Sequence, residues 1–168
     1  MRRQIFLLAA VGVFMVTLLM PQDALAPPLY QPDVLVTNNV GRGVHDPTGA
    51  GEIKPVTIHR YQKKTLLFWN FNDGGNTDTF SYWGCTGTSD FMVTWRNSLT
   101  NTDVTQQVIS GTYTTPPLDP GWSETLPDLH VKARFSAAPG NHLTCRVLAT
   151  SAGDGTQDAA GYRIRVVA

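Results

Sequence analysis

The sequence has few charged residues and no excess of either sign. Of its 168 residues only 15% are charged, and 13 Lys and Arg balance 13 Asp and Glu, whereas soluble domains typically contain about 25% charged residues. A near-neutral chain lacks the basic surface that binds a nucleic-acid backbone. Hydrophobic residues make up 42% of the chain, which excludes a disordered polar chain. We therefore expect a globular domain that does not bind nucleic acid.

The sequence also lacks the motifs of common catalytic and cofactor sites. A nucleophile elbow requires Gly-x-Ser-x-Gly, which does not occur. A blue-copper sandwich requires a His, and commonly a Met, shortly after a Cys, and neither follows Cys145. The four histidines His45, His59, His130 and His142 are scattered and show no metal-ligand spacing. We expect no enzyme activity, no cofactor and no metal site.

Residues 1–26 carry the three parts of a secretory signal. Two arginines precede an uncharged run over residues 5–20, and Ala24-Leu25-Ala26 forms a small-x-small cleavage site. Pro27 follows the expected cut and should hinder it, so an uncleaved membrane anchor remains the alternative, although the run is shorter than the about 20 residues of a spanning helix. In both cases the rest of the chain is exported. We expect a signal helix and a secreted or cell-envelope protein, associated with a membrane only if the leader is uncleaved.

Beyond residue 62 apolar residues alternate with polar ones, a pattern typical of half-buried strands. No stretch of ten residues after the leader has helical periodicity, and Gly- and Pro-rich turns separate the runs. The sequence predicts an all-β fold, an immunoglobulin-like antiparallel sandwich of two sheets with at least seven strands. The predicted inward residues are Leu67, Trp69 and Phe71; Phe80 and Tyr82; Phe91, Val93 and Trp95; Leu129, Val131, Ala133 and Phe135; Leu143, Cys145, Val147 and Ala149; and Tyr162, Ile164 and Val166.

The chain divides by composition into three parts. Residues 27–62 are rich in Pro, Gly and Asn and contain one short strand candidate, Val34-Leu35-Val36. The alternating pattern occupies residues 63–168. We therefore expect a signal peptide or anchor over 1–26, an extended segment over 27–62 and the sandwich over 63–168.

Cys85 and Cys145 are the only cysteines. An even number in an exported chain favours a disulfide over two independent thiols. Cys145 occupies the inward register of its strand, whereas Cys85 follows a strand in a glycine-rich turn. The predicted bond ties the turn 84–90 to the neighbouring strand within one sheet and does not pin two facing sheets together.

Two further features leave alternatives open. Trp83 is out of register with the inward residues of its strand and Trp122 lies in a turn, so both indoles either face a ligand such as a sugar or cover the ends of the sandwich. The acidic turns 73–78 and 154–158 carry the oxygen ligands that calcium prefers, but they also serve as turns between strands.

The order of short motifs resembles that of immunoglobulin-like modules of bacterial exported proteins, near the NEW3 and CARDB types. The motifs are Gln31-Pro32-Asp33, Thr48-Gly49-Ala50-Gly51, Asn72-Asp73-Gly74, Asp78-Thr79-Phe80, Gly111-Thr112-Tyr113-Thr114-Thr115, Leu118-Asp119-Pro120-Gly121 and Gln157-Asp158-Ala159.

The resemblance implies a non-catalytic extracellular module with a structural or adhesion role and no shared ligand-binding residues. Its partner would be a protein or glycan at the cell surface. The single copy and the cysteine pair depart from the pattern. A carbohydrate-binding module that uses exposed aromatics is the alternative function.

Overall fold

The computed structural model describes residues 28–168, and the predicted signal segment 1–26 lies outside the described residues. Within the described part, no helix is long and apolar enough to cross a membrane. The elements in chain order are β1 (Pro32–Val36), β2 (Ile53–His59), β3 (Lys63–Leu66), β4 (Phe68–Asn72), β5 (Phe80–Gly84), β6 (Phe91–Arg96), α1 (Thr105–Ile109), β7 (Tyr113–Thr114), β8 (Ser123–Thr125), β9 (Asp128–Ala133), β10 (His142–Ser151) and β11 (Gln157–Val167).

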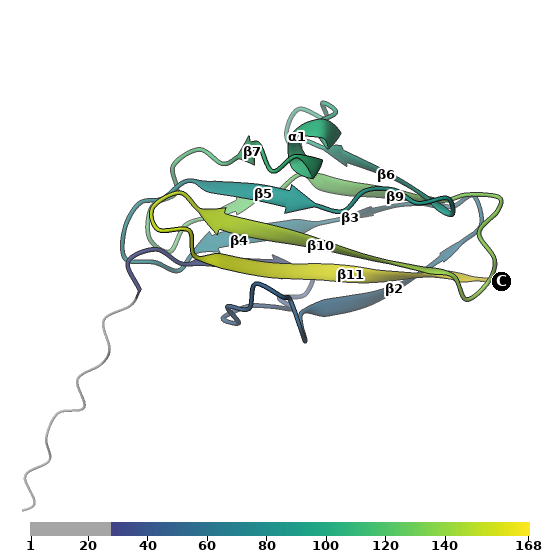
Figure 1. The fold of residues 1–168 in the computed structure, drawn as a ribbon, viewed down its shortest axis with the longest axis horizontal. Helices are drawn as coiled ribbons and strands as arrows, with labels where there is room; N and C mark the ends of the chain where they lie inside the picture. The colour runs from purple at the N-terminus through teal and green to yellow at the C-terminus, as the bar shows by residue number, and fades with distance from the viewer. Residues whose placement is uncertain (1–27) are drawn as a thin grey trace, which may run out of the picture.

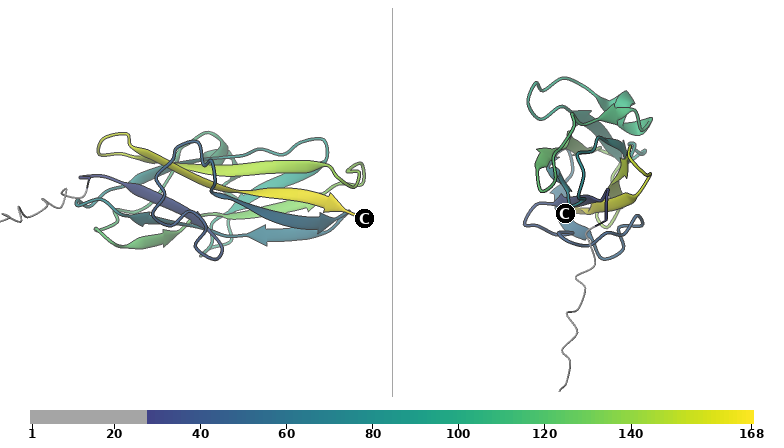
Figure 2. Two further views of the ribbon diagram at one scale, coloured as in Figure 1. Left: turned by 90° about the horizontal axis from the view of Figure 1, so that it is seen from below. Right: turned by 90° about the vertical axis from the view of Figure 1, so that its left-hand side faces the viewer.

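The strands form a sandwich, which confirms the predicted fold class. One layer is the five-stranded sheet β2-β11-β10-β5-β7, and the other combines the sheets β1-β4-β8 and β3-β9-β6. In this second layer β3 continues into β4, and β8 into β9, with short interruptions in pairing. Figure 1 shows β10 and β11 in front of β3 and β4, and Figure 2 shows that the strands follow the long axis of the molecule.

Two features differ from a purely antiparallel sandwich. The edge strand β2 pairs in parallel with β11, from Ile53 opposite Gly161 to His59 opposite Val167. The helix α1 has only five residues, too few to produce a readable helical period. The segment 27–62 thus supplies two strands, β1 and β2, where the sequence predicts one. Pro55 weakens the strand signal of β2, but proline is tolerated on an edge strand.

The predicted inward residues of β9, β10 and β11 are buried, with the exception of Phe135, which lies beyond the end of β9 and is 70% exposed. Phe80, Tyr82 and Trp95 are also buried. The alternation thus identifies the buried residues of β5, β9, β10 and the second half of β11, and Phe135 is exposed because β9 ends before it.

The register of β4 differs from the prediction by one residue. The fully buried side chains are Phe68, Asn70 and Asn72, whereas Leu67, Trp69 and Phe71 are half-buried. The amide of Asn72 donates to the carbonyl oxygens of Asn76 (2.7 Å) and Leu118 (2.8 Å), and its oxygen accepts from the Gly74 N–H (3.0 Å). These bonds satisfy the Asn72 side chain away from water, so a polar residue occupies the inward register.

The predicted disulfide between Cys85 and Cys145 is confirmed, with Cα atoms 5.1 Å apart, within the usual range for such bonds. It joins neighbouring strands of one sheet, as predicted, because β5 pairs with β10 and Gly84 lies opposite Val147. The Trp95 indole N–H donates to the Cys85 carbonyl oxygen (3.0 Å), which fixes the turn that carries Cys85 against the core.

Candidate functional site

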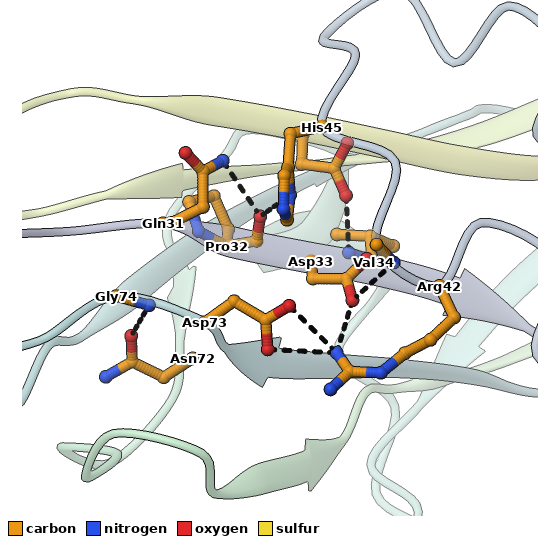
Figure 3. A network of polar contacts seen from close by, with 11 residues as sticks. Gln31, Pro32, Asp33, Val34, Arg42, His45, Asn72, Asp73 and Gly74 are labelled. Atoms are coloured by element: carbon orange, nitrogen blue, oxygen red, sulfur yellow. Dashed lines mark hydrogen bonds and ion pairs between the residues drawn. The ribbon is translucent and has the colours of Figure 1, made fainter. Parts of the chain in front are cut away.

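Several ionisable side chains meet where the segment 37–52, between β1 and β2, folds over β1. Asp33 comes from β1 and Asp158 from β11, while His45 and Glu52 come from the connecting segment. We call these four residues the carboxylate–histidine cluster. Figure 3 shows the ring of His45 next to Pro32 and the side chain of Asp33 directed to Arg42. The cluster joins three parts of the chain that are far apart in the sequence, so no local motif marks it.

Asp158 fastens the segment 37–52 to the sandwich. Its side chain is fully buried. One oxygen, Oδ1, accepts from the backbone N–H of Asp46 (2.9 Å), and the other, Oδ2, accepts from that of Val34 in β1 (2.5 Å). Burial raises the pKa of Asp158 to about 6, although these N–H donors act in the opposite direction. Each oxygen keeps a second lone pair for a further ligand.

Asp33 is also fully buried, and one of its oxygens is paired. Its Oδ2 accepts from the Arg42 guanidinium and from the Gly43 N–H (3.0 Å). Arg42 also donates to Asp73 at 2.9 and 3.1 Å and stacks 4.1 Å above the centre of the Phe71 ring, and Figure 3 shows both carboxylates directed at this guanidinium. Burial raises the pKa of Asp33, while the Gly43 and Arg42 hydrogen bonds lower it. Its Oδ1 has no hydrogen-bond partner among the described residues.

Glu52 is the least satisfied residue of the cluster. Its side chain is 1% exposed, yet neither carboxylate oxygen has a hydrogen-bond partner among the described residues. A methyl group at Gly41, where φ is +105°, would lie 2.7 Å from both Glu52 Oε2 and the Val34 carbonyl oxygen. Because both oxygens lie 2.7 Å from the same point, Glu52 Oε2 is at most 5.4 Å from the Val34 carbonyl oxygen. Val34 is also the residue whose N–H donates to Asp158.

The pKa of Glu52 follows from this position. Burial, together with the negative charges of Asp158, Asp33 and Asp46, raises it to about 8. The charges that act on Glu52 are thus those of neighbouring carboxylates. A buried carboxylate without a donor is rare in native proteins, and this one requires either a proton or a bound ligand.

His45 completes the cluster from the exposed side. One ring nitrogen and one oxygen each from Asp33 and Asp158 all lie within 4.8 Å of one another, a spacing at which one cation can contact all three. The His45 Nδ1 is 3.2 Å from the Pro32 carbonyl oxygen, a contact that orients the ring. The sequence does not predict a metal site at His45. Asp33 and Asp158 are distant from one another in the sequence, and only the fold brings them to His45. The other histidines, His59, His130 and His142, are not part of the cluster.

The carboxylates of the two acidic turns have different partners. Asp73 pairs with Arg42, and Asp158 belongs to the cluster. Asp154 instead accepts from the Thr156 N–H (2.9 Å), and Asp78 accepts from the Ser151 hydroxyl (2.5 Å). The acidic turns thus signalled part of the cluster, but only the fold shows which of their carboxylates converge.

A second feature is a basic groove of about 660 Å³ on the outer face of β2, β11 and β10. In the pairing register Arg165 lies between His142 and Thr57, and Arg163 lies between Thr144 and Pro55. Within the described residues the ion pairs involve Arg42, Asp33 and Asp73 only, so neither groove arginine has a carboxylate partner there. The groove is lined by Pro55, Val56, Thr57, Gly140, His142, Arg163 and Arg165.

The two tryptophans singled out by the sequence are exposed but come from different layers. Trp83 is 52% exposed on β5 of the five-stranded sheet, and Trp122 is 67% exposed in the turn before β8 of the other layer. Sequence reasoning missed a second exposed aromatic pair. The rings of Tyr61 and Phe135 stack with their centres 5.6 Å apart. No sequence pattern indicates this pair, because Phe135 continues the alternation of β9.

No protein-family model matches the sequence, and no curated protein is similar to it. Among solved structures, the FixG-related protein from Vibrio parahaemolyticus matches with 13% identity and a TM-score of 0.41, over 82% of this chain and 96% of that one. The PapD-like domain 7 of human CEP192 matches with 7% identity and a TM-score of 0.40, over 95% and 97% of the two chains. A cohesin–dockerin complex from Clostridium thermocellum matches with 7% identity and a TM-score of 0.41, over 82% and 99%. Similarities at this level assign neither a family nor an activity.

Proposed function

We propose that this protein is an exported, non-enzymatic immunoglobulin-like module, of the NEW3 or CARDB kind that its motifs resemble. In this proposal it holds a partner protein at the cell surface or in the extracellular space through the basic groove. The observation that carries the proposal is the pair of arginines in that groove. Arg163 and Arg165 lie on one open face without a carboxylate partner among the described residues.

The spacing of the groove suits an acidic segment of a partner protein. Arg163 and Arg165 are two residues apart on one strand, so their side chains leave the same face about 7 Å apart. Two hydroxyl side chains lie beside these arginines on the neighbouring strands, Thr57 opposite Arg165 and Thr144 opposite Arg163. Guanidinium groups bind carboxylates through strong charge-assisted hydrogen bonds, and complementary charge favours docking of an acidic chain.

The disulfide supports the proposed export. Disulfides persist in oxidising compartments and are rare in the cytosol, and Cys85 and Cys145 are joined. N-terminal sequencing of protein recovered outside the cytoplasm is expected to begin at Pro27. Recovery of intact Met1 in the membrane fraction would instead support the uncleaved anchor, and recovery only from the cytoplasm would contradict export.

The groove is tested with a labelled polyglutamate peptide as the probe. We expect wild-type protein to bind it, and binding to weaken as salt is raised. The double variant Arg163→Gln/Arg165→Gln should reduce affinity at least tenfold. The control is Lys132→Gln/Arg134→Gln, which removes two exposed basic residues from the other layer. Equal loss in both double variants, or no binding by wild type, would contradict the proposed groove.

A carbohydrate-binding role is the second candidate, favoured by the exposure of Trp83 and Trp122. Indole rings stack on sugar rings, so each exposed indole offers a separate contact. Insoluble polysaccharides should remove less of the Trp83→Ala or Trp122→Ala variant from solution than of wild type. The control Phe135→Ala, which removes another exposed aromatic ring, should be bound like wild type. Unchanged depletion in both tryptophan variants would argue against this role.

A further inference from the structure

Three ligand-type side chains, those of Asp33, His45 and Asp158, converge in the carboxylate–histidine cluster. Asp33, Asp158 and the nearby Glu52 are buried acids, and the exposed Arg42 is the cation paired with the cluster among the described residues. Isolated charges are costly to bury unless they are paired or coordinate a metal. The buried acids therefore need either protons or a further positive group.

Asp33 shows independently that the cluster leaves a ligand position open. Its side chain is fully buried, and its Oδ1 has no hydrogen-bond partner among the described residues. The negative charges of Asp33 and Asp158 also act on Glu52, whose two buried oxygens have no partner among the described residues. A cation held by Asp33, His45 and Asp158 would use the free oxygen of Asp33 and offset the negative charge beside Glu52.

We propose that the carboxylate–histidine cluster binds a divalent transition-metal cation, Zn²⁺ or Mn²⁺, with Asp33, His45 and Asp158 as its ligands. These three residues offer atoms within 4.8 Å of one another. One imidazole with carboxylates suits Zn²⁺ or Mn²⁺, whereas Ca²⁺ takes oxygen ligands. The contact from His45 Nδ1 to the Pro32 carbonyl and the N–H donors to Asp158 are the outer bonds that orient ligands in metal sites.

The site would act as a clamp. Its ligands come from β1, β11 and the segment 37–52, so a bound ion would cross-link that segment to both layers of the sandwich. Because a cation that binds only the folded state stabilises it, the melting temperature of the metal-free protein should rise on addition of the ion.

The test is calorimetric titration of EDTA-treated, dialysed protein with ZnCl₂, MnCl₂ and CaCl₂, together with thermal unfolding. We expect saturable binding of one Zn²⁺ or Mn²⁺ per chain and a higher melting temperature. His45→Gln and Asp33→Asn should each weaken binding at least tenfold. The control His142→Gln removes a histidine from the basic groove and should leave binding unchanged.

The variants separate ligand loss from unfolding. His45 is exposed in a connecting segment, so His45→Gln should retain the far-ultraviolet circular dichroism of wild type, and Asp33→Asn preserves side-chain volume. Absence of saturable binding by wild type, binding unchanged in both variants, or equal weakening in His142→Gln would overturn the proposal. Binding of Ca²⁺ alone would overturn the transition-metal assignment. None of these results bears on peptide binding at the groove, which is formed by other residues.

Discussion

Reduction of the disulfide should remove a large share of the stability of this domain. Cys85 and Cys145 are 60 residues apart, and closing a loop of this length stabilises the folded state by about 4 kcal/mol in the chain-entropy description. For a domain of this size, 1 kcal/mol corresponds to about 3–4 °C in melting temperature. Reduction should therefore lower the melting temperature by about 12–16 °C.

The measurement is urea unfolding of the same wild-type chain with and without reductant. Comparing one chain with itself avoids the cavity that replacement of the fully buried Cys145 would leave. A Cys85→Ala/Cys145→Ala variant serves as the control, because its unfolding should not respond to reductant. A change in the free energy of unfolding below about 1 kcal/mol on reduction would refute the reasoning, as would a similar response of the double variant.

Two further substitutions test the core. Tyr82→Phe should leave the free energy of unfolding unchanged or raise it by up to about 1 kcal/mol at pH 7, because the buried hydroxyl has no partner among the described residues. Burial raises the Tyr82 pKa well above 10, so wild-type stability should fall as pH rises above 10, where the unfolded tyrosine ionises, and urea unfolding should show a smaller fall for Tyr82→Phe. Gly161→Ala should destabilise by about 1–3 kcal/mol or more, since its methyl group would lie 2.4 Å from the Cys145 carbonyl oxygen. Gly75→Ala, with its nearest atom 3.9 Å away, is the control in thermal unfolding and should be nearly neutral.

The sequence was most informative where both periodicity and chain order constrain the fold. In β10 and in the second half of β11 every predicted inward residue is buried, whereas burial of residues 158–161 at the start of β11 was not predicted. The disulfide was also predictable, because export and two cysteines leave few alternatives. These inferences needed no knowledge of which strands lie side by side.

The failures have a common physical origin in contacts between distant segments. The predicted register of β4 was wrong because asparagine is usually a surface residue. The hydrogen bonds from the Asn72 amide to the carbonyl oxygens of Asn76 and Leu118, which allow its burial, depend on the fold. The parallel pairing of β2 with β11 joins strands about 100 residues apart in the chain. No local pattern contains this information.

The same limit hid the carboxylate–histidine cluster, although one part of it left a trace. Asp158 belongs to the acidic turn 154–158, whose oxygens are of the kind that calcium prefers as ligands. Glu52 and His45 lie in a glycine-rich stretch that gives no strand or helix signal. Their proximity depends on how the segment 37–52 folds back over β1, which is set by the bonds from Asp158 and Asp33.

These polar anchors explain how β1 can be buried at the end of its sheet. All five of its residues are buried, and the backbone N–H of Val34 is satisfied by the Asp158 carboxylate rather than by another strand. The carboxylates that fasten the segment 37–52 carry charge into a region where hydrophobic burial cannot balance it. Arg42 neutralises part of that charge through Asp33, and Glu52 remains without a partner among the described residues. The stability of this face therefore depends on how the negative charges of Glu52 and Asp158 are neutralised. The disulfide and the apolar core stabilise the rest of the sandwich. A cation at this point would add a second connection among β1, β11 and the segment 37–52, which the Asp158 carboxylate already joins through Val34 and Asp46. Removal of the cation should therefore loosen the segment 37–52 before it affects the core.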